Sequence, residues 1–129
     1  MAKALGVGGI FFKCQDPHKL ADWYDKWLGV PMEPNHTGCF KPETLPVGAI
    51  TAWGPFKSTT EYFDPSTKDF MFNLIVDDLE GALAQVVEGG AEVVGEIEEG
   101  EYGRFGWFMD PEGNKVELWV PPPDAAPNP

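Results

Sequence analysis

The sequence predicts an α+β fold in which one βαβββ unit occurs twice. Three observations point to this fold. A strand that ends in an acidic turn, followed by a helix that ends at glycine, occurs in both halves of the chain. The two halves also end alike, since Thr51-Ala52-Trp53 matches Glu117-Leu118-Trp119 at an offset of 66 residues. Between the helix and the last strand, each half has room for two further strands.

These patterns set the expected boundaries of a single domain at residues 1–121. We expect the first module at about residues 6–56 and the second at about residues 69–121. A linker rich in turn-forming and polar residues joins them at residues 57–68. Residues 122–129 are rich in proline, so we expect a disordered tail there.

The first half begins with a predicted strand at Ile10 to Asp16, and a helix from Pro17 to Leu28 follows it. Asp16 is a suitable N-cap, and Pro17 suits the first helical turn. Apolar residues recur at helical spacing, and Gly29 ends the helix. The next stretch, residues 33–46, is so rich in proline and glycine that its strands are poorly marked. A last strand is expected at residues 49–54.

The second half shows the same order more clearly. A strand from Phe72 leads to a helix at Leu79 to Glu88, with Asp78 as its candidate cap. Strands are then expected at residues 91–94, 104–109 and 115–120. The last two should form a hairpin, because Asp-Pro-Glu-Gly-Asn between them supplies turn geometry.

Composition excludes some partners. The 129 residues carry a formal net charge of −12, which repels nucleic-acid phosphates and anionic lipid. The acidity is densest in residues 96–101, interpreted as a solvated loop or edge. The chain has no apolar run of the roughly 18 residues needed to cross a bilayer, and its two cysteines make no disulfide framework. We therefore expect a cytoplasmic protein with no nucleic-acid or membrane partner.

Particular residues resemble the vicinal oxygen chelate superfamily, which includes glyoxalase I, bleomycin-resistance proteins and extradiol dioxygenases. The resemblance covers about residues 6–121 and is most specific in the Asp-Pro-x-Gly-Asn-x-x-Glu pattern that ends at Glu117. The other matching motifs are Ile10–Phe12, Asp16-Pro17, Trp23-Tyr24, Leu28-Gly29, Phe72–Asp78 and Gly89–Ala91. The resemblance implies two βαβββ modules whose sheets curve into an open cup with the ligand inside. It also implies frequent homodimers, in which modules can pair across chains.

Metal-dependent members of this superfamily place ligands on the first and last strands of each module. The matching positions here are Gly9, Thr51, Met71 and Glu117. Glycine has no side chain, methionine is a soft ligand, and threonine is a poor neutral donor. One remaining carboxylate does not hold a divalent ion tightly, so we expect no metal cofactor and no glyoxalase I activity.

Strand alternation and the family map together predict what lines the cup. The expected lining combines aromatic and apolar side chains with a few polar groups, as in a small-molecule pocket. Its members are Phe11, Lys13, Thr51, Trp53, Met71, Asn73, Glu117 and Trp119. Arg104 could bind an anionic group of the ligand or pair with Glu101 at the surface. The alternative is a cup filled by its own aromatics or by a second subunit.

Three functions remain open from the sequence. The first is a metal-independent protein that binds a small, partly aromatic molecule. The second is a lyase, isomerase or dioxygenase-type enzyme, with Glu117 as acid/base and Lys13 or Asn73 as the oxyanion partner. The third is a non-catalytic dimeric interaction module. Glu117 is then a catalytic group, a hydrogen-bond anchor for a ligand, or a residue satisfied by a neighbour.

Overall fold

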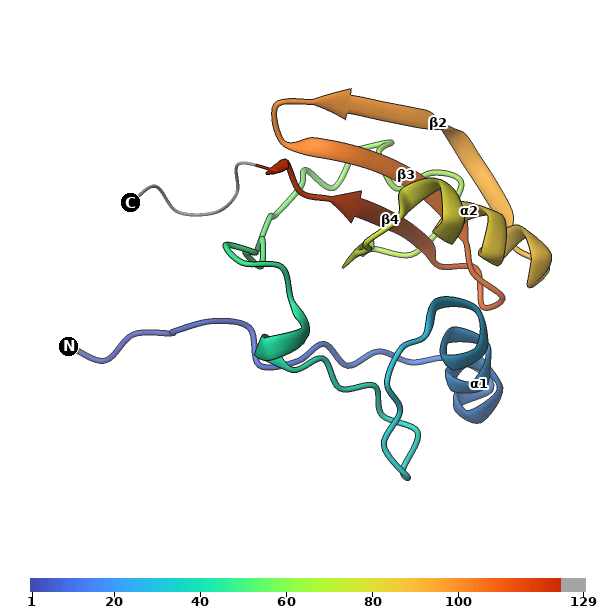
Figure 1. Ribbon diagram of the computed structural model, residues 1–129, viewed down its shortest axis with the longest axis horizontal. Coiled ribbons are helices and arrows are strands. Elements are labelled where there is room, and N and C mark those ends of the chain that lie inside the picture. Colours follow the sequence, from blue (N-terminus) through green and yellow to red (C-terminus); the bar gives the residue numbers. More distant parts are fainter. Residues whose placement is uncertain (124–129) are drawn as a thin grey trace.

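The second half of the chain forms a four-stranded sheet (Figure 1). The computed structural model describes residues 1–123, so most of the predicted tail, residues 124–129, lies outside the described residues. The spatial strand order is β1-β4-β3-β2, with β1 parallel to β4 and the other neighbours antiparallel. The strands are β1 (Phe72–Ile75), β2 (Glu92–Gly100), β3 (Gly103–Met109) and β4 (Lys115–Val120). The predicted α+β class and the βαβββ order of this half are confirmed.

Two α-helices form where the sequence predicts them, α1 (Pro17–Leu28) and α2 (Leu79–Glu88). The Asp16 side chain accepts a hydrogen bond from the backbone N–H of Lys19 at 3.1 Å, and Asp78 caps α2 in the same way. Gly29 ends α1 in the left-handed region at φ 62°. Local capping signals thus set the helix boundaries.

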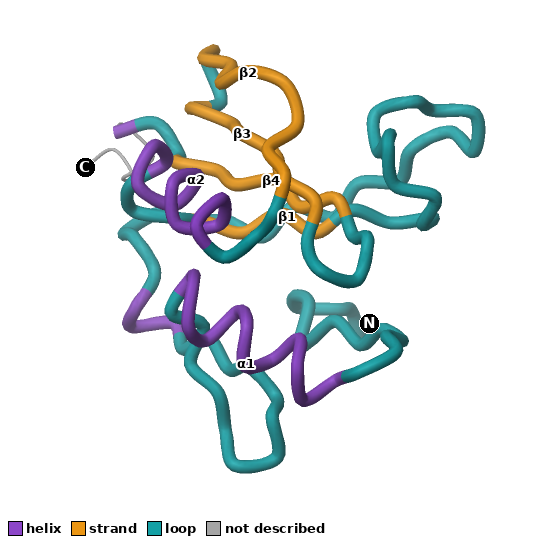
Figure 2. The backbone as a smooth tube through the Cα atoms, turned by 90° about the vertical axis from the view of Figure 1, so that its right-hand side faces the viewer, coloured by secondary structure: helices purple, strands orange, loops and turns teal. Residues whose placement is uncertain are grey.

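Helix α2 packs on one face of the sheet and encloses the core (Figure 2). The fully enclosed side chains come from α2, β3 and β4. They are Leu79, Ala82, Val86, Phe108, Val116 and Leu118. Helix α1 packs against α2, and its Trp23, Tyr24 and Leu28 pack against this same core. The helix of the first half therefore contributes to the core of the second half.

The first-half strand segments are arranged differently from the prediction. Residues 10–14 and 49–54 are extended, but within residues 1–123 neither joins a strand ladder. Between the end of α1 and residue 49, the chain forms a short 3-10 helix, η1 (Pro42–Thr44), and an isolated antiparallel bridge between Met32 and Gly38. Large apolar side chains stay exposed, with Phe11 at 90% and Trp53 at 79%. Alternation signals an extended chain, but a strand also needs a partner edge.

The acidic run extends β2 beyond its predicted end. Residues 96–100 continue the strand along β3 after a register shift between Val94 and Glu98. Because β2 lies at the edge of the sheet, its carboxylates face water and discourage edge-to-edge pairing. The interpretation of this run as a solvated edge is confirmed.

The predicted turn at Asp110–Asn114 also joins the two halves of the chain. Asp110 accepts hydrogen bonds from the backbone N–H groups of Glu112 and Asn114, each at 2.9 Å, and from the Tyr24 hydroxyl at 2.8 Å. The Glu112 carboxylate accepts from the backbone N–H groups of Gln15 and Asp16, both at 3.0 Å. The hairpin turn thereby positions the start of α1. In residues 1–123, no helix has the length and apolar character needed to span a membrane.

Candidate functional site

Glu117 lies on the face of the sheet that points away from α2, called here the Glu117 face. Its neighbours Val116 and Leu118 point into the core, so alternation along β4 turns the carboxylate to the other side. Its cross-strand partners are Asn73 on β1 and Trp107 on β3. Glu117 is only 7% exposed. A carboxylate in such a place needs hydrogen-bond partners.

Three donors satisfy this carboxylate. The Asn73 amide Nδ2 donates to Oε1 at 2.7 Å, and the Trp107 indole Nε1 donates to Oε2 at 2.9 Å. The third donor is the Tyr62 hydroxyl, at 2.6 Å from Oε2. Hydrogen bonds to a charged acceptor are the stronger kind, so the carboxylate is held in one orientation. Oε1 accepts one hydrogen bond and Oε2 accepts two, which leaves Oε1 able to accept another.

Tyr62 reaches Glu117 from residues 56–64, called here the linker strap. Its ring stacks on Phe56, with centroids 5.7 Å apart, and meets Trp107 edge-on at 6.2 Å. The Lys115 ammonium donates to the backbone carbonyl of Tyr62 at 2.7 Å and lies 5.3 Å from the centre of its ring. The strap therefore crosses the Glu117 face and is fastened at two points.

Burial shifts the pKa of both titratable groups of this contact toward the neutral form. Burial, and then the hydrogen bond to Glu117, raise the pKa of the Tyr62 hydroxyl above its usual value. Burial lowers the pKa of the Lys115 ammonium, although the nearby carboxylates of Glu117, Asp64 and Glu98 oppose this. Tyr62 thus remains a hydrogen-bond donor to Glu117 across the physiological pH range.

Beside the carboxylate, three aromatic rings form a wall on the same face. Phe105 stacks on Trp107 with centroids 6.4 Å apart, and on Trp119 with centroids 6.1 Å apart and planes within 7°. The Trp119 indole donates to the carbonyl of Tyr102 at 2.7 Å, which fixes its ring. An aromatic surface that ends at an acceptor is suited to a flat ligand with a polar edge.

The residues around Glu117 do not fit a divalent metal ion. Its oxygens accept N–H and O–H hydrogens, and such hydrogens point where a cation would have to lie. Of the four positions that the resemblance maps to metal ligands, the other three carry Gly9, Thr51 and Met71. Across the described part of the chain, no three side chains of His, Cys, Asp or Glu gather as a metal site would require.

The structure brings some predicted site residues together and separates others. Asn73 and Trp119 share the Glu117 face, on the strands that flank or contain Glu117. Met71 lies just before β1 and is half-buried. Exposed first-half segments carry the remaining predicted cup residues, apart from Arg104. These are Phe11, Lys13, Thr51 and Trp53.

Arg104 lies on the opposite face of the sheet, not in the predicted lining. Its guanidinium binds both carboxylate oxygens of Glu80 on α2, at 2.9 and 2.6 Å, and Glu99 on β2 at 2.6 Å. These partners replace the surface pair with Glu101 that the sequence suggested. Arg104 therefore ties α2 to β2 and β3.

Sequence reasoning missed four residues of this site. Trp107 and Phe105 could have been found, because alternation along β3 puts them opposite Glu117 and Trp119. Lys115 shares the parity of Glu117 along β4 and could also have been found. Tyr62 gave no such signal, because it lies in a linker with no repeating pattern.

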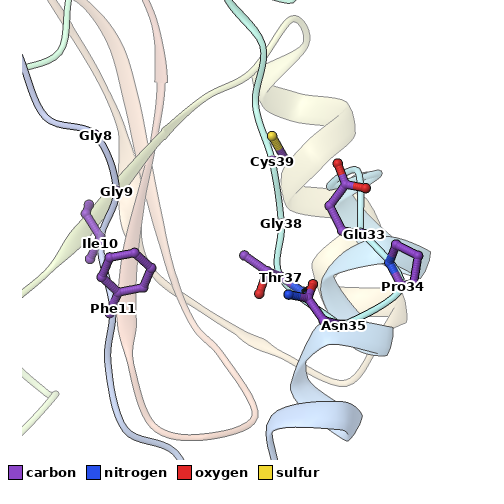
Figure 3. A pocket seen from close by; sticks show the side chains of 10 residues that line it. All are labelled: Gly8, Gly9, Ile10, Phe11, Glu33, Pro34, Asn35, Thr37, Gly38 and Cys39. Atoms are coloured by element: carbon purple, nitrogen blue, oxygen red, sulfur yellow. Dashed lines mark hydrogen bonds between the residues drawn. The ribbon is translucent and has the colours of Figure 1, made fainter.

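Two cavities of the described residues lie away from Glu117. One of about 510 Å³ separates residues 8–11 from residues 33–39 (Figure 3). Another of about 250 Å³ lies between residues 46–49 and the ends of β1 and β4. The linker strap crosses the Glu117 face, and neither of these two cavities includes Glu117.

Comparison with known proteins identifies the family of the chain. No curated protein matches the chain. A solved structure of a hypothetical protein from S. aureus is 23% identical, with a TM-score of 0.38, and the match covers 44% of this chain. The match spans 47% of that structure, which is less than half its length. The Glyoxalase-like domain family matches residues 9–119, which include both helices and all of the sheet except its last residue, Val120. The chain therefore belongs to the Glyoxalase-like domain family, part of the vicinal oxygen chelate superfamily.

Proposed function

We propose that this protein binds a small, partly aromatic molecule on the Glu117 face without a metal ion. The observation that carries the proposal is the fixed carboxylate at the end of the aromatic wall. A ring lying against Phe105 and Trp119 could donate a hydroxyl or amino hydrogen to the free acceptor position on Oε1 of Glu117. In this proposal the protein works in the cytoplasm. Its two cysteines, Cys14 and Cys39, are free thiols.

The hydrogen bonds that the Glu117 carboxylate already accepts favour ligand binding over acid–base catalysis. A general base takes a proton from the substrate and must be free to release it again. Here Asn73, Trp107 and Tyr62 hold both oxygens in place, and one acceptor position, on Oε1, remains for a ligand. Such an oxygen serves better as a hydrogen-bond anchor that fixes the orientation of a ligand.

A ligand titration tests this function. The probes are one- and two-ring aromatics that carry a hydroxyl or amino group, followed by tryptophan fluorescence and by saturation-transfer NMR. We expect at least one probe to bind, and Glu117→Gln to weaken it about tenfold or more, equivalent to about 1.4 kcal/mol. Glu101→Gln is the matched control, because it removes an exposed carboxylate from the β2–β3 turn and should leave the affinity unchanged. Equal affinity in both variants would exclude Glu117 as the anchor.

Metal independence has its own measurement. We expect purified protein, washed with a chelator, to bind these probes as before and to hold no stoichiometric divalent ion. One tightly bound ion per chain would contradict the proposal.

We also propose that the protein works as a homodimer. Its support is the exposed apolar surface of the first half, where Phe11 and Trp53 are almost fully in water. Where such side chains gather into one patch, the patch marks an interaction site. Light scattering should give twice the mass of one chain at micromolar concentration.

A further inference from the structure

The cavity between residues 8–11 and 33–39 is bordered by two extended segments, as a position that lacks one strand of a sheet would be. Figure 3 shows the two extended segments running alongside each other with a gap between them. Cys39 donates its backbone N–H to the Pro31 carbonyl, and Glu33 donates to the Thr37 carbonyl, both at 2.9 Å. In an antiparallel pair such bonds alternate, so the N–H and C=O of Gly38 point away from Met32, toward the gap.

The facing segment is equally unpaired. Among the described residues, no backbone hydrogen bond joins Gly8–Phe11 to another segment. Backbone polar groups seek partners, so two open edges on either side of a gap can accept an added strand. Gly8 and Gly38 line the gap, and their lack of a side chain permits close backbone approach.

The internal repeat identifies which sequence belongs in the gap. In the second half β4 lies between β1 and β3. Gly8–Phe11 overlaps residues 10–13, the first-half counterpart of β1 at an offset of 62, and residues 37–39 correspond to residues 107–109 of β3. The counterpart of β4 is Ala49–Trp53, 66 residues before Lys115–Trp119. By position and pattern, Ala49–Trp53 is the strand that the gap lacks.

The chain's own Ala49–Trp53 is held elsewhere. Ala49 and Val47 line the other cavity, together with Val76 and Val120 at the ends of β1 and β4. Downstream, Phe56 stacks on Tyr62, which is bonded to Glu117. Figure 1 shows this stretch leaving η1 and rising to the sheet, away from the segments that border the gap. Its own copy thus lies beside the second-half sheet and not in the gap.

The charge pattern favours a second copy as the source of the strand. Residues 4–12 and 45–56 contain no charged residue, although 23% of the chain is charged and the net charge is −12. Two copies would repel through most of their surfaces and could approach through these segments. Ile50 is 65% exposed and therefore available to a partner.

We propose that two copies of this chain exchange Ala49–Trp53, each inserting it between residues 8–11 and 37–39 of the other. The exchange is reciprocal, so it closes as a two-fold dimer and leaves no gap unfilled. The proposal rests on the homodimer of the proposed function and names the surface that forms it.

The repeat also predicts the register of the inserted strand. Gly29 matches Gly90 at an offset of 61, so Met32 matches Val93, whose partner is Phe108. The bridge from Met32 to Gly38 then aligns Cys39 with Met109. Met109 pairs with Lys115, the counterpart of Ala49. Cys39 of one chain should therefore lie opposite Ala49 of the other.

A disulfide tests this register directly. The variant Cys14→Ser/Ala49→Cys keeps the natural Cys39 and adds one thiol, and oxidised glutathione accepts the two electrons as the bond forms. Directly opposed strand residues have Cα atoms within the range that a disulfide spans. We expect covalent dimers on a non-reducing gel, with Cys39 joined to position 49 in peptide mass spectra. Cys14→Ser/Ala52→Cys, with its thiol on the other strand face, is the matched control and should give at least tenfold less dimer.

Each other outcome overturns the exchange. A bond between positions 39 and 49 within one chain would show that the gap closes on its own strand. No bond, or equal bonding in the Ala52→Cys control, would show that the strand does not enter the gap. Light scattering separates the two proposals, because a monomer excludes both, whereas a dimer without this bond excludes the exchange alone.

Discussion

The two halves of this chain share one sequence pattern and differ in structure. Val116 on β4 is fully buried, whereas its counterpart Ile50, 66 residues earlier, is 65% exposed. The helices account for the difference. Helix α2 covers its own sheet, and α1 also packs on that core through Trp23 and Tyr24. Within residues 1–123, the first-half side chains Ile10, Phe11 and Ile50 stay exposed. A repeated pattern therefore yields a repeated fold only where the apolar face finds a cover and the edge finds a partner.

Replacing one phenylalanine by alanine in each half should give the largest and most unequal changes in the free energy of unfolding. Phe108→Ala should lower the free energy of unfolding by about 3–5 kcal/mol, because Phe108 is fully buried in the core. Phe11→Ala should change it by less than about 0.5 kcal/mol in the monomeric chain. Urea unfolding followed by circular dichroism measures both. If Phe11→Ala lowers the free energy of unfolding strongly, but only at concentrations where the dimer forms, Phe11 lies in the interface.

The paired positions Glu117 and Thr51 offer a second contrast. Glu117→Gln should cost about 1–3 kcal/mol, because the amide cannot accept the hydrogen bonds of Tyr62, Trp107 and Asn73 together. Thr51→Val should be nearly neutral, since Thr51 is exposed. The same unfolding experiment compares them, and equal losses would contradict the difference between the halves.

Alkaline pH should weaken the contact between α1 and the hairpin turn. Burial, and then the charge of Asp110, raise the pKa of the Tyr24 hydroxyl above its ordinary value near 10. The unfolded chain loses this proton above about pH 10 while the folded chain keeps it. The free energy of unfolding should hold below about pH 10 and fall by up to about 1.4 kcal/mol per pH unit above it.

The control for this pH effect is Tyr24→Phe, which removes the hydroxyl. It should be less stable at neutral pH, because Asp110 loses a donor, but its stability should fall less steeply above pH 10. An identical slope in the variant and the parent protein would assign the alkaline loss to other groups.

The smallest loss of stability is expected for the replacement of Glu112, whose carboxylate joins the two halves of the chain. Glu112→Ala removes the acceptor for the backbone N–H groups of Gln15 and Asp16 and should cost about 1 kcal/mol. Hydrogen exchange should speed up at these two amides and stay unchanged in β3 and β4. Unchanged exchange at both amides would mean that another group holds the start of α1.

Much of the second half could be predicted because its signals act over a few residues. Asp16 and Asp78 cap helices that begin one residue later, and the Asp110–Asn114 turn sets the hairpin that carries Glu117. The face that Glu117 occupies follows from alternation along β4. The contact with Tyr62 could not be predicted, because 55 residues separate the two groups and the linker has no periodicity.

The sequence by itself determined the two helices, the order of the strands in the second half, the acidic edge, and the family to which the chain belongs. The tertiary structure decided which helix covers which sheet, why the first-half strands remain unpaired, and how Tyr62, Asn73 and Trp107 converge on Glu117. The physical reason is the distance along the chain between the residues that interact. Capping, turn chemistry and alternation depend on near neighbours, whereas pairing and burial depend on the surface that a folded chain presents to a distant segment.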